Sequence, residues 1–251
     1  MQQGVKEKAR ALLENGTVSR VLGWKKGEFC YDLTPAVFAS PEEVDRNFVY
    51  SDFSGANLSK YLIAESNKEG KIAAFLKPCD SYSFVQLLKE HRIARERVYA
   101  VGVPCEGMCD MEKIKAKGIS GVTGIEEQGE TLRLRTFYGE ETLNRADVLL
   151  EKCAVCKSKK IVCFDELLCE QGEEQSSDRF AEVERLEAMS PEERFAFWRG
   201  ELSRCIRCNA CRNVCPACSC EKCVFDNPES GAQNKAAADS FEENLFHIIR
   251  A

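Results

Sequence analysis

The chain has 251 residues, of which 44% are apolar and 30% charged, and its formal net charge is -6. This composition is typical of a globular protein with a hydrophobic core, and the acidic balance argues against a nucleic-acid partner. No apolar run approaches the roughly 20 residues that span a bilayer, and the amino terminus has the pattern of a charged amphipathic helix rather than a signal peptide. We therefore expect no membrane span and a cytoplasmic location.

The first 50 residues predict two helices and a strand. Apolar residues recur at helical spacing before Gly16, which predicts a helix over residues 3–15. A short strand is expected around residues 19–24. The capping box SPEE, residues 40–43, predicts the start of a second helix.

The clearest unit is a strand, a helix and a second strand. Two short apolar runs, residues 71–76 and 98–103, flank a helical segment that Asp80 can cap and that ends near His91. This order predicts a parallel pair with a right-handed crossover. Each strand ends in a proline–cysteine turn, KPCD or VPCE. Ligands of open parallel sheets gather beyond the carboxyl ends of the strands, so a cofactor is expected near the cysteines that follow them: Cys79, Cys105 and Cys109.

The remaining chain predicts a division into two domains. Alternation in TLRLRTFYGE indicates a β-hairpin or edge strand within residues 121–142, turning at Tyr138 and Gly139, and a helix from about Asn144 leads into CAVC. The polar, acidic stretch 170–180 is the expected linker. It separates an α/β (α+β) domain from a loop-rich, ferredoxin-like domain, with these boundaries: residues 1–169 and residues 181–251.

Two further helices are expected in the second domain. A capping box at Ser190, Pro191 and Glu193 opens a helix that delivers the chain to the cysteine-rich region. The sequence SFEENLFHIIRA, residues 240–251, predicts a carboxy-terminal helix with one apolar stripe.

The stretch CIRCNACRNVCPACSCEKC places seven of the fifteen cysteines in nineteen positions. In a reducing compartment, crowded thiols indicate metal ligation or redox chemistry before disulfides. The run begins CxxCxxCxxxCP, in which the first three thiolates bind one [4Fe-4S] cluster and the fourth ligates the other cluster of two-cluster ferredoxins. This spacing assigns Cys205, Cys208 and Cys211 to one cluster and Cys215 to another. The remaining ligand of the first cluster is one of three downstream residues: Cys218, Cys220 and Cys223.

The second cluster needs further thiolates, and Cys153 and Cys156 in CAVC are the expected partners of Cys215. Cys105 is favoured as the fourth ligand of this second cluster, because its turn follows the carboxyl end of a strand, where ligands of parallel sheets bind. The alternatives are Cys163 and Cys109. If Cys109 closes a cluster with Cys105, Cys153 and Cys156, Cys215 returns to the first group.

Zinc is the alternative metal, since it also accepts four thiolates, and the region would then be an interaction module. The third evenly spaced cysteine and Pro216 favour iron. The isolated Cys30 and Cys169 are expected to be core or surface thiols.

Together, CIRCNACRNVCPACSCEKC, KPCD and VGVPCEGM resemble the β subunits of coenzyme F420-reducing hydrogenases and formate dehydrogenases, and their bacterial iron–sulfur relatives, from about Ser51 onward. The resemblance implies a subunit of an anaerobic multi-subunit oxidoreductase that carries [4Fe-4S] clusters and often a flavin. Carried over residue by residue, it covers Cys205, Cys208, Cys211, Cys215, Cys153, Cys156 and Cys105. This chain departs from the family in having its ferredoxin sequence at the carboxy-terminal end and no glycine-rich phosphate loop.

We therefore expect an electron-transfer subunit with two [4Fe-4S] clusters, relaying electrons between other oxidoreductase subunits and ferredoxin-type carriers. Signatures of acid–base, nucleophilic and phosphoryl chemistry are missing from the sequence, so no bond chemistry is expected. The alternative is a flavin-containing subunit, with FAD beyond the strands, that exchanges hydride with F420 or a nicotinamide. Lys77 and Cys79 would then contact the cofactor, Lys77 by neutralising a reduced flavin or a phosphate. Otherwise Lys77 is expected to be an exposed residue at a strand end.

Overall fold

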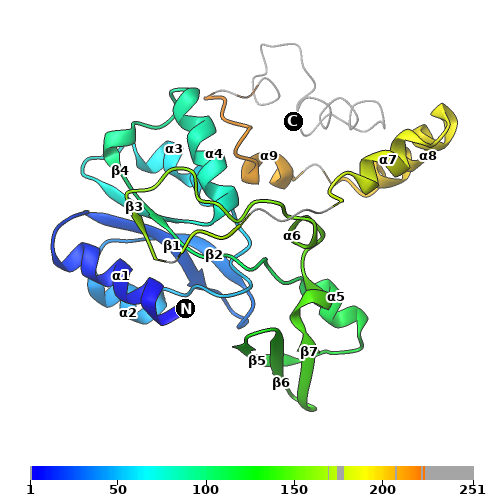
Figure 1. Cartoon of the computed structure of the whole chain (residues 1–251), viewed down its shortest axis with the longest axis horizontal. Coiled ribbons are helices and arrows are strands. Elements are labelled where there is room, and N and C mark those ends of the chain that lie inside the picture. Colours follow the sequence, from blue (N-terminus) through cyan, green and yellow to red (C-terminus); the bar gives the residue numbers. More distant parts are fainter. Residues whose placement is uncertain (1, 169, 174–177, 207, 222, 224–251) are drawn as a thin grey trace. The chain divides into compact units, whose positions relative to one another are not determined.

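The computed structural model describes residues 2–168, 170–173, 178–206, 208–221 and 223. The chain forms two compact units, Met1–Ser177 and Asp178–Ala251 (Figure 1). The first unit contains both β-sheets of the described residues, and the described part of the second unit is helical.

The main sheet of the first unit has the strand order β2-β1-β3-β4-β8. Its strands are β1 Arg20–Lys26, β2 Leu33–Phe38, β3 Ile72–Leu76, β4 Val98–Gly102 and β8 Glu166–Leu167. β1 pairs with β2 in antiparallel fashion, whereas the β1–β3, β3–β4 and β4–β8 pairs are parallel. The expected mixed α/β architecture with a parallel strand–helix–strand unit is thus confirmed. Because every residue of β3 is buried, this strand forms the middle of the core.

Helices pack around this sheet. The early ones are α1 Gln2–Glu14, α2 Pro41–Asn47, η1 Ser59–Tyr61, α3 Leu62–Glu65, α4 Pro78–Lys89 and η2 Arg95–Arg97. α1 contacts α2, and their ribbons lie side by side in Figure 1. α4 contacts η1. Their apolar faces join β1, β3 and β4 in one large core that includes Trp24, Phe75 and Phe84. Burial of this apolar surface is the main favourable term that holds the unit together.

α4 begins earlier than the sequence predicted. Asp80 was expected to be the residue before the helix, but Lys77 holds that position and Pro78 is the first helical residue. The reason is that proline suits the first turn of a helix, where its missing N–H costs nothing. Asp80 still caps the helix, from within its first turn, because its Oδ2 accepts a hydrogen bond from the Lys77 N–H at 3.1 Å.

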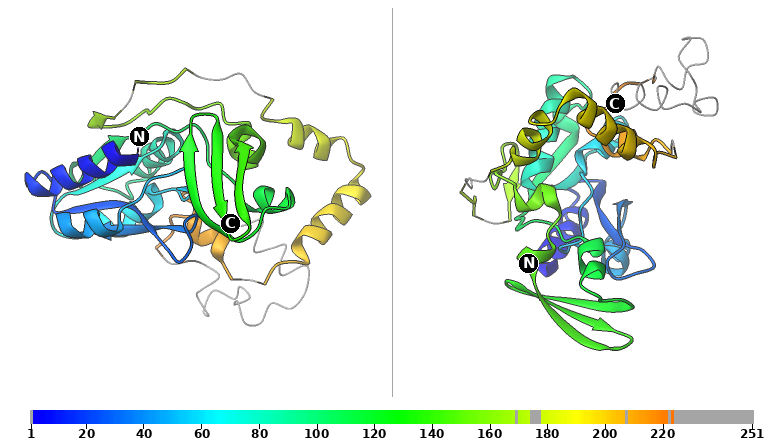
Figure 2. Two further views of the ribbon diagram at one scale, coloured as in Figure 1. Left: turned by 90° about the horizontal axis from the view of Figure 1, so that it is seen from below. Right: turned by 90° about the vertical axis from the view of Figure 1, so that its right-hand side faces the viewer.

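A second sheet of the first unit consists of three antiparallel strands, β5 Val122–Gln128, β6 Thr131–Thr136 and β7 Gly139–Asn144. Figure 2 shows it as a ribbon that does not continue the main sheet. The expected hairpin corresponds to β6 and β7, and β5 extends it. Leu132 and Leu134 on β6 pack with α5, Met111–Ala116, in a small separate core.

The prediction of one continuous helix from Asn144 into CAVC is wrong. The segment forms a 3-10 turn, η3 Arg145–Val148, and a short helix, α6 Glu151–Ala154. Leu149 and Leu150 between them have extended backbones, Leu149 forms a β-bridge with Cys109, and the Leu150 N–H donates to the Met108 carbonyl at 2.8 Å. Pairing with the loop after β4 therefore interrupts the helix.

The second unit contains α7 Ala181–Glu187, α8 Pro191–Leu202 and α9 Ala210–Val214. The predicted capping box of α8 is present, because Ser190 Oγ accepts from the Glu193 N–H and the Glu193 carboxylate accepts from the Ser190 N–H. The predicted carboxy-terminal helix over residues 240–251 lies outside the described residues. In the described part of the chain, no helix is both long and apolar enough to cross a membrane.

Candidate metal centre

The two proline–cysteine turns lie side by side at one edge of the main sheet. Pairing of Leu76 with Gly102 brings the carboxyl ends of β3 and β4 level, and the Val103 N–H donates to the Leu76 carbonyl at 3.0 Å. Cys79 follows β3 in the first turn of α4, and Cys105 follows β4. Because parallel strands end at the same edge, two turns distant in sequence meet at one place.

Lys77 is buried below these turns, so the expectation of an exposed strand-end lysine is wrong. Its side chain is 2% exposed, and its Nζ lies 3.0 Å from Asp80 Oδ2. The ammonium also donates to the Ala56 carbonyl at 2.9 Å and stands 4.4 Å from the centroid of the Trp24 ring. A buried ammonium needs such partners to offset its desolvation. Burial raises the pKa of the Asp80 carboxyl, and Lys77 opposes that rise.

Hydrogen bonds fix the loop that carries Cys105. The Tyr50 hydroxyl donates to the Pro104 carbonyl at 2.6 Å, and the Lys159 ammonium donates to the Cys105 carbonyl at 3.2 Å. The Arg145 guanidinium donates to the carbonyls of Glu106 and Gly107 at 2.9 and 2.6 Å. Arg145 and Lys159 thus tie the segment around α6 to this loop.

The CAVC pair is brought against the same loop. Gly107 has a φ of +106°, and a Cβ added there would stand 3.4 Å from the Cβ of Cys153. The Cys156 N–H donates to the Cys153 carbonyl at 3.2 Å, and the Cys156 Sγ donates to the Ser158 carbonyl at 3.5 Å. Cys105, Cys153 and Cys156, which the sequence assigned to one cluster, therefore lie in one region of the first unit.

The thiols in this region influence one another electrostatically. Burial raises the pKa of Cys79 to about 12, the Asp80 carboxylate adds to the rise, and the Cys105 and Cys156 sulfurs contribute smaller increments. Burial also raises the pKa of Cys105, with Cys153 among the lesser causes. A hydrogen bond from the Gly107 backbone and the Lys77 charge oppose that rise.

The alternative ligands of this region have other surroundings. Cys109 is 5% exposed and belongs to the small core beneath the second sheet, where burial raises its pKa to about 12. Cys163 packs against the main core and influences the pKa of Arg95, which precedes β4. Cys105 follows that strand. Cys30 is half-buried at the edge of the small core.

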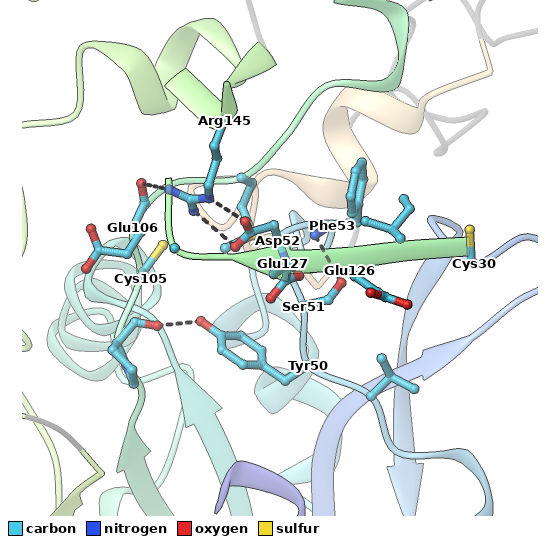
Figure 3. Close-up of a pocket in the computed structure, with 15 residues that line it drawn as sticks. Cys30, Tyr50, Ser51, Asp52, Phe53, Cys105, Glu106, Glu126, Glu127 and Arg145 are labelled. Atoms are coloured by element: carbon cyan, nitrogen blue, oxygen red, sulfur yellow. Dashed lines mark hydrogen bonds and ion pairs between the residues drawn. The ribbon is translucent and has the colours of Figure 1, made fainter. Parts of the chain in front are cut away.

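A cavity of about 570 Å³ adjoins Cys105 (Figure 3). Its carboxylates come from Asp52, Glu106, Glu126 and Glu127, and its one basic lining residue is Arg145. Arg145 Nη2 donates to Asp52 Oδ1 at 3.0 Å, and Glu127 accepts from the Asp52 N–H at 2.6 Å. Desolvation of its carboxyl raises the pKa of Glu127, although the residue as a whole is exposed. The sequence did not predict this cavity, because Asp52 and Arg145 are 93 positions apart and follow no motif.

A smaller cavity of about 360 Å³ also touches this turn. It shares Pro104, Cys105 and Glu106 with the first cavity and adds Pro78 and Lys159. Cys105 therefore borders both of these cavities.

In the second unit, the cysteine run surrounds α9. Cys208, Cys211 and Cys220 are exposed, and the other thiols of the run, Cys205, Cys215, Cys218 and Cys223, are half-buried. The Cys218 N–H donates to the Cys215 carbonyl at 3.1 Å, which places a turn directly after the cysteine–proline pair. Arg207 and Lys222 of this run lie outside the described residues.

The donor chemistry of both regions fits an iron–sulfur cluster. Among the described residues, no three His, Cys, Asp or Glu side chains are placed to hold a single metal ion. A zinc ion holds each sulfur about 2.3 Å away, so its thiolates must crowd together, whereas a [4Fe-4S] cluster inserts four irons and four sulfides between them. Neighbouring thiols that do not converge on one point are therefore compatible with a cluster.

Comparisons with known proteins identify relatives over most of the chain. No protein-family model matches it. It is 24% identical to the F420-dependent formate dehydrogenase subunit beta of Methanocaldococcus jannaschii, over 86% of this chain and 72% of the relative. It is 25% identical to the F420-dependent formate dehydrogenase 1 subunit beta of Methanococcus maripaludis, over 85% of this chain and 71% of the relative. The resemblance stated from the motifs is thus confirmed.

Among solved structures, the chain is similar to one from the F420-reducing [NiFe] hydrogenase complex of Methanosarcina barkeri. The TM-score is 0.49 at 15% identity, and the match covers 61% of this chain and 58% of that chain, which is less than two thirds of its length.

Proposed function

Starting from homology to subunits of oxidoreductase complexes, we propose that this chain is an electron-transfer subunit that relays electrons through two [4Fe-4S] clusters. The electrons pass between the cofactor of a partner subunit and a ferredoxin-type carrier. The observation that supports the proposal is the packing of Cys153 of the CAVC pair against the loop that carries Cys105, in a chain that also contains a ferredoxin-type run.

The chain's own residues have distinct roles in this proposal. Cys205, Cys208 and Cys211 hold one cluster together with a further thiolate of the run, and Cys105, Cys153 and Cys156 hold the other. A bound cluster accepts and releases one electron at a time. Lys77 lowers the pKa of the Cys79 and Cys105 thiols, but Asp80, with which it pairs, raises the pKa of Cys79 by more.

The flavin-containing alternative has one observation in its favour, since the names of both formate dehydrogenase relatives include F420. The cavity beside Cys105 is large enough for a ring system. Its charge opposes a phosphate-bearing cofactor, because four carboxylates line it and the guanidinium of Arg145 already pairs with Asp52. Lys77 likewise forms an ion pair with Asp80, so its charge would contribute little to the binding of a flavin phosphate.

Purification without oxygen, followed by quantification of iron, acid-labile sulfide, zinc and released flavin per chain, tests this proposal. We expect about eight irons and eight sulfides, without flavin or zinc. One flavin per chain beside the iron would favour the flavin-containing alternative. A chain that contains zinc but no acid-labile sulfide would overturn the redox function and would favour the zinc-stabilised interaction module.

A further inference from the structure

A basic segment surrounds and follows the CAVC pair in the first unit. Residues 152–160 contain four lysines and no aspartate or glutamate, in a chain whose net charge is -6. Lys152, Lys157 and Lys160 are exposed, and Lys159 is half-buried. Basic residues that concentrate on one part of an acidic protein create a local positive potential, which attracts a partner of opposite charge. This segment is therefore a candidate interaction surface.

Contacts with the main sheet fix the position of this segment. The Lys159 ammonium donates to the Cys105 carbonyl, after β4, at 3.2 Å. The Val162 N–H donates to Ser81 Oγ, in the first turn of α4, at 3.1 Å. Ile161 between these two anchors is 4% exposed and belongs to the interior. The chain after CAVC therefore runs past the edge at which β3 and β4 end, next to the turn that carries Cys105.

Two lysines of the segment carry charges that are available to a partner. In the part of the chain that the structure describes, neither Lys152 nor Lys160 forms an ion pair. By contrast, the exposed Lys115 on α5 pairs with Glu112 at 2.7 Å, which cancels much of its field. A charge without an internal partner acts on molecules that approach the surface.

An acidic stretch of the chain itself already packs beside this segment. The Gln171 amide accepts from the Ile161 N–H at 2.9 Å and donates to the Ile161 carbonyl at 3.0 Å. Glu170 and Glu173, on either side of Gln171, line the cavity of about 360 Å³ together with Lys159. The inner part of the basic segment thus accepts carboxylates as neighbours.

Apolar side chains complete the surface. Val162 and Phe164, which follow the basic segment, are 44% and 41% exposed. Protein interfaces combine apolar contact area with charged groups that orient the partner and speed the encounter. Transient electron-transfer complexes have small interfaces, below about 1,200 Å², so a few lysines and two apolar side chains are enough to form one.

We propose that the exposed lysines of residues 152–160, together with Val162 and Phe164, form the docking surface for an acidic electron-carrier protein. The inference rests on the proposed function and deepens it, because it states where the carrier docks and which charge it bears. The CAVC thiols lie within the basic segment, so a carrier docked there stands next to proposed cluster ligands. The reduced carrier loses one electron and the oxidised cluster gains it, without transfer of a proton or a change in any bond.

Charge reversal in the full-length chain, purified without oxygen, tests this surface. The variant Lys152→Glu/Lys160→Glu replaces two positive charges by two negative ones. The matched control Lys71→Glu/Lys89→Glu makes the same change at two exposed positions of the opposite sheet edge, since Lys71 precedes β3 and Lys89 ends α4. The probe is a reduced, acidic two-cluster ferredoxin. Stopped-flow absorbance measures how fast it reduces each protein at about 50 and about 500 mM NaCl.

We expect Lys152→Glu/Lys160→Glu to lower the second-order rate constant about tenfold or more at the lower salt concentration, because like charges oppose the encounter. The difference from wild type should shrink at the higher concentration, where salt screens exposed charges. The control should react nearly as fast as wild type. Iron content, circular dichroism and electron paramagnetic resonance (EPR) spectra should be the same in all three proteins, since the substitutions are on the surface.

The outcomes separate this inference from the function on which it rests. If the wild type holds iron and sulfide but both variants slow equally, or neither slows, the docking surface is wrong and the electron-relay function stands. Vesicles that contain anionic lipid are a second probe. Vesicle binding that is lost in Lys152→Glu/Lys160→Glu, with an unchanged ferredoxin rate, would make the surface a membrane contact and contradict the proposal. A wild type without iron and sulfide would overturn the proposed function itself.

Discussion

Lys77 and Asp80 form a buried ion pair directly beneath the cysteine turns, and their energetics can be tested independently of any metal. Both side chains are at most 2% exposed. Removing one partner of a buried pair leaves an uncompensated charge, which costs more than the pair itself contributes. The sequence offered no sign of this burial, because Trp24 and Ala56, which surround the ammonium, are far from Lys77 in the chain.

We predict that Lys77→Met lowers the free energy of unfolding by about 3–5 kcal/mol, since it strands the Asp80 charge. The double variant Lys77→Met/Asp80→Asn should recover part of that loss, because asparagine is neutral and can still accept the hydrogen bond at the start of α4. Urea unfolding measures both values. Equal stability of Lys77→Met and wild type would show that the pair is not buried in solution.

Glu127 gives a pH-dependent prediction. Desolvation raises the pKa of its carboxyl above the ordinary value, so ionisation is harder in the folded chain than in the unfolded one, and the effect is small because the residue as a whole is exposed. The resulting destabilisation is absent below the unfolded pKa of about 4.5, grows as the pH rises toward the folded pKa, and is constant above it. Glu127→Gln removes this cost and keeps a group that can accept the Asp52 hydrogen bond.

We therefore expect Glu127→Gln to be more stable than wild type at pH 8, with a gain that shrinks as the pH falls to 5. Thermal unfolding across that range provides the measurement. Glu141→Gln, at an exposed position of β7, is the control and should show little change. A gain for Glu127→Gln that grows toward pH 5 would contradict the assigned direction.

At the level of elements, the strand–helix–strand unit was predictable because its signals are local. Apolar runs, a proline at the helix start and two proline–cysteine turns all lie within residues 71–105. The second sheet was predicted only in part, because all of β7 except Leu143 is exposed and shows no alternating apolar pattern. The broken helix near Asn144 depends on pairing with Met108 and Cys109, which local spacing does not reveal.

The close packing of β8 and the segment before it on β4 is an element-level prediction. A Cβ added at Gly102 would lie 2.5 Å from Leu167 and 2.7 Å from Ile161. We expect Gly102→Ala to destabilise the first unit by about 1–3 kcal/mol, since side chains must move in a packed core. Gly4→Ala in α1, where no atom stands within 4 Å, is the matched control and should be neutral or slightly stabilising in urea unfolding. Equal effects of the two substitutions would argue against this packing.

At the scale of the whole molecule, the candidate site was partly predictable. Spacing singled out the seven cysteines of the run and the CAVC pair, because cluster ligation imposes short, regular intervals. The meeting of the turns that carry Cys79 and Cys105, and the packing of Cys153 near Gly107, depend on strand register and loop contacts, so no interval in the sequence encodes them. The domain division at residues 170–180 stays a prediction, although the compact units divide between Ser177 and Asp178.

Under the proposed function, Cys208 serves the cluster of the cysteine run, so its loss should affect that run and not the first unit. We predict that Cys208→Ala removes the cluster of the second unit and leaves the urea midpoint of the first unit unchanged. In a Trp198→Phe background, the buried Trp24 is the remaining tryptophan and reports on the first unit by fluorescence. Leu76→Ala, in the core of that unit, is the positive control and should lower the midpoint. A lower midpoint in Cys208→Ala would contradict independent folding.

The central claim, an electron relay without bond chemistry, is tested most directly by anaerobic reductive titration of the wild-type chain, followed by optical and EPR spectroscopy. The account predicts uptake of about two electrons per chain, in one-electron steps that each produce the signal of a reduced iron–sulfur cluster. Reduction of a bound flavin as the main electron uptake, or a chain that accepts no electrons, would contradict it.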